Sequence, residues 1–549
     1  MRPTALLTII VLVACSAGPE RAPDFQADRL LADISVLAHD SLLGRAPGTP
    51  GEEKTVAFLS ARFAEAGLQP GNPDGSWTQV VDLVGITGTP AATFRVAGRP
   101  LPLTWRDDYV AVSRRIAPEV RVDNSELVFV GYGVVAPEYG WDDYKDVDVR
   151  GKTVVMLVND PAVPDSLDIS RLDTETFRGD AMTYYGRWTY KYEIATEKGA
   201  AAVLVIHEDG PAGYPWEVVR GGWSGERMET RPADGNINRV AIEGWISAPR
   251  ARELMAAAGQ DFDGLKLSAT SRDFRPVSLN GTASFVVSQQ LRDVRSRNVI
   301  GILPGSDDSL RNEYVIYTAH WDHFGIGEAV NGDSIYNGAR DNASGTAALL
   351  ELARGFQRAG APRRSIVFLA VTAEEQGLLG AKWYAANPLY RLNKTLANIN
   401  VDVLNAWGPT RDVVVIGMGN SSLDEVLAEA ATPLGRTLVP DLEPSKGFFY
   451  RSDHFEFAKR GVPALYIDEG NDYISHPVGF AAVKDSLWTA DLYHKPADEV
   501  DPTWDMTGAI ADLQLLYEVG RRVANADSWP SWKEGTEFKS VRERSLATP

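Results

Sequence analysis

The chain has 549 residues, enough for two or three domains of ordinary size. Its formal net charge of −19 argues against nucleic acid as the main partner and against charge-driven binding to an anionic lipid surface, because both need clustered basic residues. Apolar residues make up 44% of the chain, which is typical of a globular protein with a buried core.

Residues 1–14 have the pattern of a signal peptide. Arg2 precedes an apolar run, Ala5 to Ala14, that is too short to span a bilayer. The sequence Leu12-Val13-Ala14-Cys15 resembles the bacterial lipobox, in which the cysteine is lipidated and becomes the first mature residue. Cys15 is the only cysteine, which fits export without disulfides. We therefore expect an exported protein, secreted or held in the cell envelope (outer membrane or periplasm), that meets the membrane only through a lipid anchor at Cys15.

Residues 25–119 are predicted to form the N-terminal part of the main domain. Helical patterns cover about 30–37 and 52–66, and a glycine- and proline-rich turn separates them. From about residue 120 the pattern changes to short β-type runs separated by Gly, Pro and Asp. We therefore predict a separate, small α/β or β-rich domain over residues 120–285.

Residues 286–530 are predicted to form the main domain, followed by a C-terminal tail over 531–549. Strand and helix patterns alternate here, which indicates a mostly parallel sheet with helices on both faces. The predicted strands are 314–317, 365–370, 398–403, 413–416 and 464–467, and the predicted helices are 343–357, 378–386, 421–431 and 506–523.

Polar residues collect at the carboxyl ends of these predicted strands, where open α/β sheets place their functional groups. Imidazole and carboxylate are good zinc ligands, and one carboxylate can bridge two metal ions. Adjacent glutamates allow one to bind metal while its neighbour acts as general base. The residues that follow strands or open a helix are His320, Asp341, Glu374, Glu375 and Asp402.

Five ordered segments resemble metallopeptidase family twenty-eight, which includes bacterial leucyl aminopeptidases, glutamate carboxypeptidases and the transferrin receptor. The resemblance is close over residues 295–525, and the Gly44-Arg45 and Gly48-Thr49 region resembles the N-terminal part of the same domain. It implies an α/β zinc-exopeptidase (phosphorylase/hydrolase-like) fold, a mixed, mostly parallel sheet sandwiched by helices. It also implies that residues 120–285 are an inserted β-rich protease-associated (apical) domain. The five segments are His320-Trp321-Asp322-His323, Gly338 to Gly345, Thr372 to Gly380, Asn400-Val401-Asp402 and Tyr493 to Asp498.

The resemblance also implies the roles of individual residues. Two zinc ions per chain would share a bridging hydroxide and the carboxylate of Asp341. The other metal ligands would be His320 and Asp402 at one ion, and Glu375 and His494 at the other. The catalytic residues would be Glu374 as general base, Asp322 as the partner of His320, and Tyr493 as a hydrogen-bond donor to the reacting carbonyl. We expect His323 and His476 not to be ligands, and Ser452-Asp453-His454 to lie near the pocket without binding metal.

The function that follows is a zinc-dependent exopeptidase, an aminopeptidase acting on peptides. The nearest alternative is a carboxypeptidase or dipeptidase that recognises a free carboxylate, with Arg340 and Arg451 as candidate contacts. Glutaminyl cyclase and a non-catalytic receptor rank lower, because the former generally lacks the apical insertion and all five ligands and the base are intact here. The segment 468–493 is predicted to be a long loop over or beside the pocket, and homodimerisation is left open.

Overall fold

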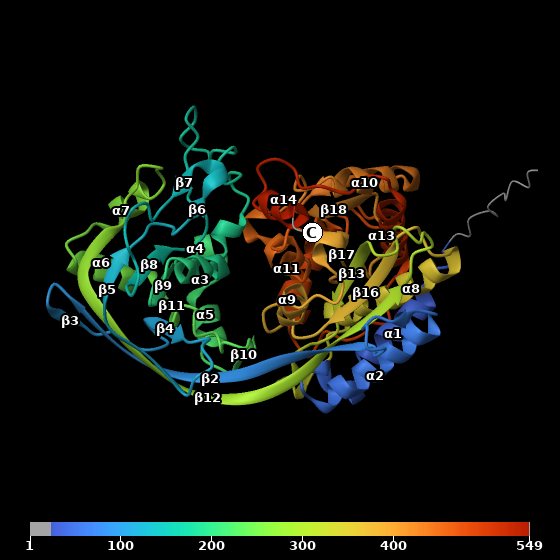
Figure 1. Cartoon of the computed structure of the whole chain (residues 1–549), viewed down its shortest axis with the longest axis horizontal. Coiled ribbons are helices and arrows are strands. Elements are labelled where there is room, and N and C mark those ends of the chain that lie inside the picture. The colour runs from blue at the N-terminus through green and yellow to red at the C-terminus, as the bar shows by residue number, and fades with distance from the viewer. Residues whose placement is uncertain (1–22, 548–549) are drawn as a thin grey trace, which may run out of the picture.

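The computed structural model describes residues 23–547, so the predicted signal peptide and Cys15 lie outside the described residues. The described chain forms two lobes joined by a long two-stranded ribbon (Figure 1). The main lobe comprises residues 23–84 and 294–547, and the second lobe comprises residues 92–287. No helix within residues 23–547 is long and apolar enough to cross a membrane.

The main lobe contains a mixed, mostly parallel sheet, as predicted. Its neighbouring strands run in the order β19, β18, β20, β17, β13, β16 and β12, and only the β18–β20 and β12–β16 pairs are antiparallel. The bounds are β12 Val277–Leu303, β13 Tyr314–His320, β16 Ser365–Val371, β17 Thr395–Asn400, β18 Asp412–Ile416, β19 Thr437–Pro440 and β20 Ala464–Asp468.

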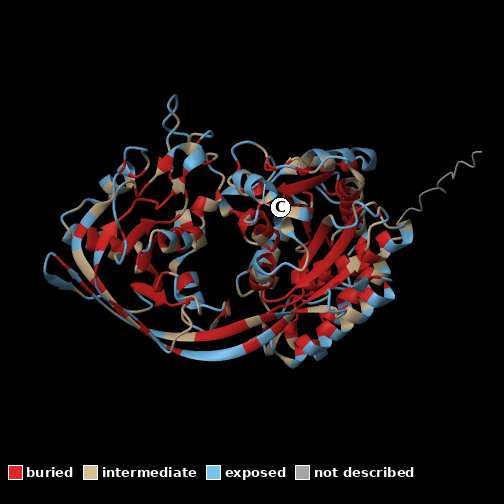
Figure 2. Ribbon diagram, viewed as in Figure 1, coloured by how far each residue is buried: buried red, intermediate tan, exposed pale blue. Residues whose placement is uncertain are grey.

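Helices cover both faces of this sheet because its central strands are apolar on both sides. In β16, Phe368 packs in the cluster that contains α1, α2, α8 and α13, whereas its neighbour Leu369 packs in the opposite cluster with α9 and α11. Figure 2 shows the strands of both lobes as buried, with exposed residues on the outer helices. The helix bounds are α1 Ala27–Leu37, α2 Pro50–Glu65, α8 Gly345–Ala359, α9 Leu379–Ala386, α11 His454–Ala458 and α13 Thr507–Asn525.

The second lobe is an α/β unit in which the same sheet continues. Strands β5, β8, β9 and β11 are parallel neighbours, and α3 (Trp188–Glu197) and α6 (Ala248–Ala257) pack beside them. The expected β-rich character is therefore only partly met, and the assignment to the protease-associated domain stays a prediction. The strand bounds are β4 Tyr109–Val112, β5 Glu119–Phe129, β8 Thr153–Leu157, β9 Ala202–His207 and β11 Ile242–Ser247.

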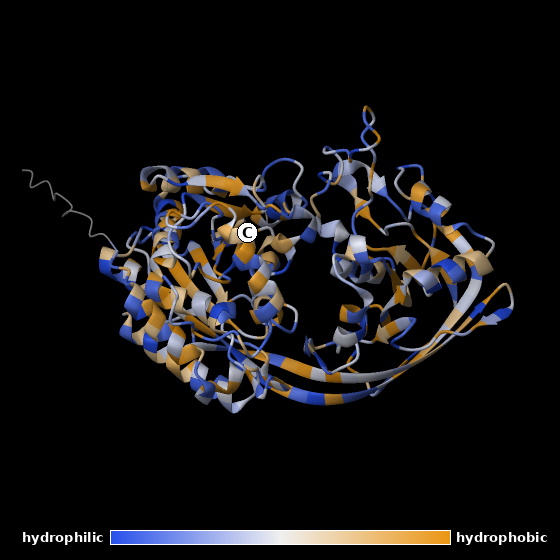
Figure 3. Cartoon of the chain, turned by 180° about the vertical axis from the view of Figure 1, so that it is seen from behind, coloured by the Kyte–Doolittle hydropathy of each residue, from blue (hydrophilic) through white to orange (hydrophobic). Residues whose placement is uncertain are grey.

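The predicted domain boundaries at residues 120 and 285 need correction. Phe94 and Tyr109 already lie in the core of the second lobe. Strand β12 runs without a break through residue 285, paired with β2 (Thr78–Val96) from Gly281 opposite Val96 to Val299 opposite Thr78. A continuous ladder, rather than a flexible linker, therefore joins the lobes. Figure 3 shows apolar residues concentrated in the strands of each lobe and mixed with polar ones along the ribbon.

Two further segments differ from their predictions. The expected loop over 468–493 contains α12 (Phe480–Leu487) and the π-helical turn η9 (Trp488–Leu492). The expected tail packs on the main lobe, because Trp532 and Phe538 are buried in a cluster with Phe449. Helix α14 (Lys539–Ala547) follows these two aromatic residues.

Ion pairs also connect the lobes. Lys382 of α9 lies 2.6 Å from the carboxylate of Glu229, which is only 2% exposed and which Arg239 and Arg114 also contact. Although burial raises the pKa of this carboxyl, the three cations together bring it below its ordinary value. A second pair joins Lys459 to Glu193 of α3 at 2.6 Å.

We expect Lys382→Met to lower the free energy of unfolding by about 1–3 kcal/mol, because a buried carboxylate loses one of its cations. A urea titration measures this change. The control is Lys152→Met, at the exposed pair of Lys152 with Glu126, where we expect less than about 1 kcal/mol. Equal losses of unfolding free energy in the two variants would show that the buried pair of Lys382 with Glu229 stabilises the fold no more than an exposed pair does.

Candidate metal centre

The carboxyl edge of the main sheet brings the predicted ligands together. His320 is the last residue of β13, Glu375 follows β16, and Asp402 follows β17. Asp341 lies in the turn that enters α8, and His494 follows η9. Parallel strands end at one edge of a sheet, so side chains far apart in sequence converge there.

The carboxylate of Asp341 lies between the two histidines. Its Oδ1 is 3.2 Å from Nε2 of His320, and its Oδ2 is 3.3 Å from Nε2 of His494. Asp402 Oδ1 is also 3.3 Å from Nε2 of His320, and Glu375 Oε2 is 3.3 Å from Nε2 of His494. The carboxylate of Asp341 therefore lies between one group of side chains, His320 and Asp402, and another, His494 and Glu375.

The cluster carries more negative charge than its own cations balance. Burial lowers the pKa of His320, but the charges of Glu374 and Asp402 raise it well above its ordinary value. Burial raises the pKa of Glu375 well above its ordinary value, and the charge of Asp341 raises it further. An excess of buried carboxylates costs free energy unless a cation binds among them and neutralises their charge. His320, Asp341 and Glu375 each offer a ligand atom within 4.8 Å of the others, so the donor set fits a metal such as zinc.

Hydrogen bonds hold the ligands in place. Ser452 Oγ donates to Asp402 Oδ2 at 2.6 Å, and Asp498 accepts from the backbone N–H of Asp341 at 3.0 Å. Nδ1 of His323 is 2.6 Å from Oε1 of Glu375, and the other oxygen of that carboxylate, Oε2, faces His494. The sequence singled out Ser452 as lying near the pocket but did not reveal the role of His323.

Asp322 does not make the contact predicted for it. Its carboxylate is 3.9 Å from Nδ1 of His320, whereas its backbone carbonyl is 3.2 Å from that nitrogen. The carboxylate instead accepts from the backbone N–H of Glu374 at 3.1 Å. Asp322 therefore positions the predicted base, and its backbone carbonyl orients the imidazole of His320.

Tyr493 and Glu374 border the cluster. The Tyr493 ring stacks on His494 with centroids 3.7 Å apart, and 43% of the residue is exposed. Glu374 Oε2 is 4.0 Å from Nε2 of His320, farther than the oxygens of Asp341 and Asp402. Burial, together with the charge of Glu375, raises the pKa of Glu374 well above its ordinary value.

Arg45 lies beneath the ligand loops. Its buried guanidinium donates to the carbonyls of Trp321 at 2.8 Å, Asn337 at 2.6 Å and Gly338 at 2.9 Å. These carbonyls belong to the loops that carry His320 and Asp341. The resemblance placed Arg45 in the same domain, but no local pattern showed that it organises the metal centre.

The remaining candidate residues lie in different surroundings. Arg340 is buried, pairs with Glu469 at 2.8 Å and has its guanidinium carbon 4.3 Å from the ring centroid of Trp407, so it is not free to bind a substrate. Arg451 is partly buried and its Nε has no hydrogen-bond partner. His476 stacks on Phe480, with ring centroids 3.8 Å apart.

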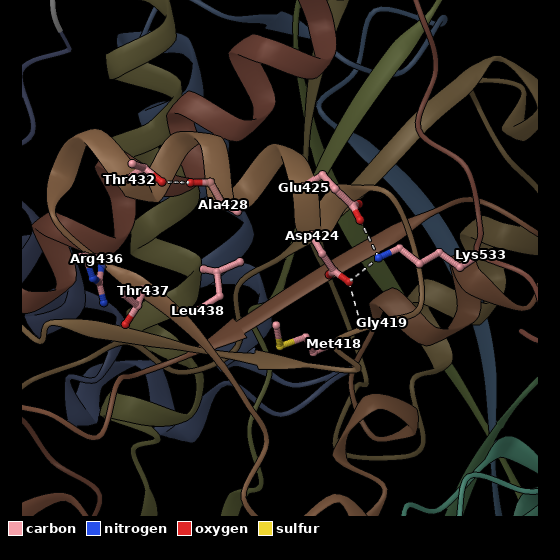
Figure 4. A pocket seen from close by; sticks show the side chains of 10 residues that line it. All are labelled: Met418, Gly419, Asp424, Glu425, Ala428, Thr432, Arg436, Thr437, Leu438 and Lys533. Atoms are coloured by element: carbon pink, nitrogen blue, oxygen red, sulfur yellow. Dashed lines mark hydrogen bonds and ion pairs between the residues drawn. The ribbon is translucent and has the colours of Figure 1, made fainter. Parts of the chain in front are cut away.

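One cavity in the main lobe lies away from the cluster. It has a volume of about 410 Å³ and lies beside α10 (Leu423–Ala431) and β19 (Figure 4). Asp424 and Glu425 both face Lys533 at its rim, so its charged groups are paired. None of the five predicted ligands lines it.

The fold is α/β, and the cluster at the edge of its sheet has the donors of a metal site. Residues 298–517 match the model of peptidase family M28.

Curated proteins with related names are also similar to this chain. A probable glutamate carboxypeptidase of Zea mays is 25% identical over 426 residues, covering 71% of this chain and 54% of that protein. A probable zinc metalloprotease of Pyrenophora teres f. teres is 28% identical over 240 residues, covering 36% and 48%. The chain thus spans about half the length of these curated relatives.

Solved structures are also similar in part. An aminopeptidase from an Aneurinibacillus species has a TM-score of 0.46 and 19% identity, covering 92% of this chain and 95% of that one. A zinc aminopeptidase from Bacillus subtilis has a TM-score of 0.43 and 18% identity, covering 94% and 98%.

We expect His323→Phe to weaken zinc binding by roughly 10- to 100-fold, because the outer partner of a metal-ligating carboxylate is lost. Zinc titration against a competing chelator, with the bound metal counted by mass spectrometry, measures this without activity. The control is His476→Phe, because His476 stacks on Phe480. Unchanged zinc affinity in His323→Phe would mean that Glu375 needs no such partner.

Proposed function

We propose that the protein is a zinc-dependent exopeptidase, an aminopeptidase with two zinc ions per chain. The observation that carries the proposal is the carboxylate of Asp341, whose two oxygens face two different histidines at 3.2 and 3.3 Å. A carboxylate placed in this way suits the bridge of a two-metal site. His320 and Asp402 would hold one ion, and Glu375 and His494 the other.

Bound zinc would supply Lewis acidity for the scissile carbonyl and for the attacking water. Glu374 would take a proton from that water and deliver it to the leaving nitrogen as the C–N bond breaks. Its backbone N–H is held by the carboxylate of Asp322 at 3.1 Å, which fixes the position of this residue. Tyr493 would donate to the oxyanion that develops on the carbonyl.

The excess negative charge of the site favours a substrate with a free α-amine, which is cationic at neutral pH. A carboxypeptidase or dipeptidase remains the second candidate. Arg340 no longer supports it, because this side chain is paired with Glu469. Arg451 does support it, because its Nε is buried without a partner.

We also propose that the protein is exported and anchored by a lipid at Cys15, on the lipobox-like sequence Leu12-Val13-Ala14-Cys15. Its partners would be peptides, without nucleic acid.

We expect Glu374→Gln to lower kcat by roughly 10²- to 10⁴-fold, because the general base is lost. Zinc content should be unchanged, since Glu374 is not assigned as a ligand. The control is Glu443→Gln, which replaces an exposed glutamate that pairs with Lys446. Full turnover in Glu374→Gln would contradict the assignment of the base.

We expect chelator-sensitive release from aminoacyl chromogenic amides, and none from N-blocked peptides with free carboxyl ends. The reason is that only the former present an ammonium group to the acidic cluster. A panel of both substrate classes, assayed with and without a zinc chelator, measures this. Cleavage of the N-blocked peptides alone would establish the carboxypeptidase instead.

A further inference from the structure

We propose that the second lobe carries a binding site of its own: a cavity at the carboxyl edge of its sheet that binds an organic cation, an alkylammonium or guanidinium group. None of the five predicted metal ligands lines this cavity, so the inference goes beyond the proposed function and does not depend on it. The proposal rests on the place of the cavity in the fold, the excess of carboxylates around it, and a buried histidine and a tryptophan in its wall.

Three neighbouring strands bring polar residues to the cavity. Strand β9 ends at His207 and β11 ends at Ser247, and these two residues are partners in the parallel ladder. Strand β4 runs antiparallel to β11, so Asp107 and Asp108, which precede β4, lie at the same edge. The backbone carbonyl of Asp108 accepts from the N–H of Ser247 at 2.9 Å. The carboxyl edge of a parallel sheet is where α/β folds commonly bind their ligands.

The wall of the cavity is acidic. Its volume is about 740 Å³, which suits a small organic molecule. Of the eleven described residues that line it, five are acidic and one, Arg250, is basic. Arg250 pairs with Asp108 at 2.8 Å and with Glu253 at 2.6 Å. Lysine and arginine side chains from outside the wall approach Glu208 at 2.7 Å and Asp107 at 4.0 Å. Five carboxylates therefore meet three cations, and the cavity favours a positively charged ligand.

Asp209 and His207 are the groups left open to such a ligand. Within residues 23–547, no Lys or Arg forms an ion pair with Asp209, whose Oδ1 is 3.4 Å from Nδ1 of His207. His207 lines the cavity, is 2% exposed, and its Nε2 has no hydrogen-bond partner. Burial lowers the pKa of His207 below its ordinary value, so the imidazole is neutral at neutral pH. A neutral imidazole has a lone pair that can accept from an ammonium or guanidinium group, and Asp209 supplies the opposite charge.

Trp216 adds an aromatic face to the wall. Its indole N–H donates to the carbonyl of Arg106 at 3.1 Å, and its ring centroid is 5.5 Å from that of His207. The indole N–H is thus already bonded, and the ring offers its π face to the cavity. Organic cations bind over tryptophan faces, and carboxylates close by strengthen that attraction.

A metal ion fits this cavity less well than an organic cation. Among residues 23–547, only His320, Asp341 and Glu375 bring three ligand atoms within 4.8 Å of one another. The second-lobe cavity therefore lacks the compact set of ligands that a divalent ion needs. An alkylammonium or guanidinium group needs only separate hydrogen-bond acceptors and an apolar or aromatic surface for its carbon chain.

The experiment compares two probes that differ by one ammonium group. N-acetyl-lysinamide and N-acetyl-norleucinamide share the same backbone and alkyl chain, and only the former is charged. We expect calorimetry on the chelator-treated full-length protein to show roughly 10-fold or tighter binding of N-acetyl-lysinamide. N-acetyl-argininamide tests the guanidinium group in the same way. Binding of n-butylamine as well would identify a free amine as a sufficient ligand, whereas binding of the amides alone would identify a basic residue of a peptide.

Variants of the wall test the assignment of the site. Asp209→Asn and His207→Phe should each weaken binding of N-acetyl-lysinamide by roughly 10-fold, and Trp216→Leu by roughly 3- to 10-fold. The side chain of Asp209 is 72% exposed, so its variant is expected to fold even where His207→Phe does not. The matched control is Asp123→Asn, an exposed carboxylate of β5 outside the cavity, which should leave the affinity unchanged. Thermal unfolding shows whether each variant is folded.

Three results would overturn the proposal. The first is equal affinity of the wild type for the charged and uncharged probes. The second is an affinity for N-acetyl-lysinamide that survives in both Asp209→Asn and Trp216→Leu. The third is a bound Mn²⁺ ion, counted by mass spectrometry, that only Asp209→Asn loses while no amine binds. Since these measurements need no turnover, a chain that hydrolyses no peptide would contradict the proposed function and leave the cation site standing.

Discussion

The buried guanidinium of Arg45 is the constraint on which the metal centre depends. Its hydrogen bonds tie the carbonyls of Leu37, Trp321, Asn337 and Gly338 to one rigid planar group. Burial lowers its pKa to about 10, and the charges of nearby acids, Asp498 first among them, oppose that shift. Arg45 therefore stays charged at neutral pH. It fixes the two ligand loops and supplies positive charge beneath a cluster of carboxylates.

The side chains above Arg45 carry more negative than positive charge. One arginine and three imidazoles, those of His320, His323 and His494, lie near Asp341, Glu374, Glu375, Asp402 and Asp322, and this leaves a net negative cluster in a buried position. Such a cluster costs free energy until a cation binds. The same excess that destabilises the metal-free site would give it affinity for divalent ions, so stability and metal binding are linked.

The two lobes form one continuous structure around this centre. Strands β2 and β12 pair along their length, and residues 290–293 of β12 are exposed between the lobes. Two ion pairs also hold the second lobe against the main lobe. Lys382 of α9 pairs with Glu229, and Lys459, which follows α11, pairs with Glu193.

The sequence alone predicted the order of strands and helices in the main lobe, because apolar runs and their periodicity follow from local burial. Residue type and position after a strand also picked out His320, Glu375 and Asp402 as candidate ligands, whereas His494, which follows η9, was added by the family resemblance. Only the tertiary structure decided which atoms meet. Asp322 contacts the backbone of Glu374 rather than the ring of His320, Arg45 unites loops almost 300 residues away, and β12 crosses the expected domain boundary. Such contacts depend on how segments far apart in the chain pack against one another, and no local pattern of residues encodes that packing.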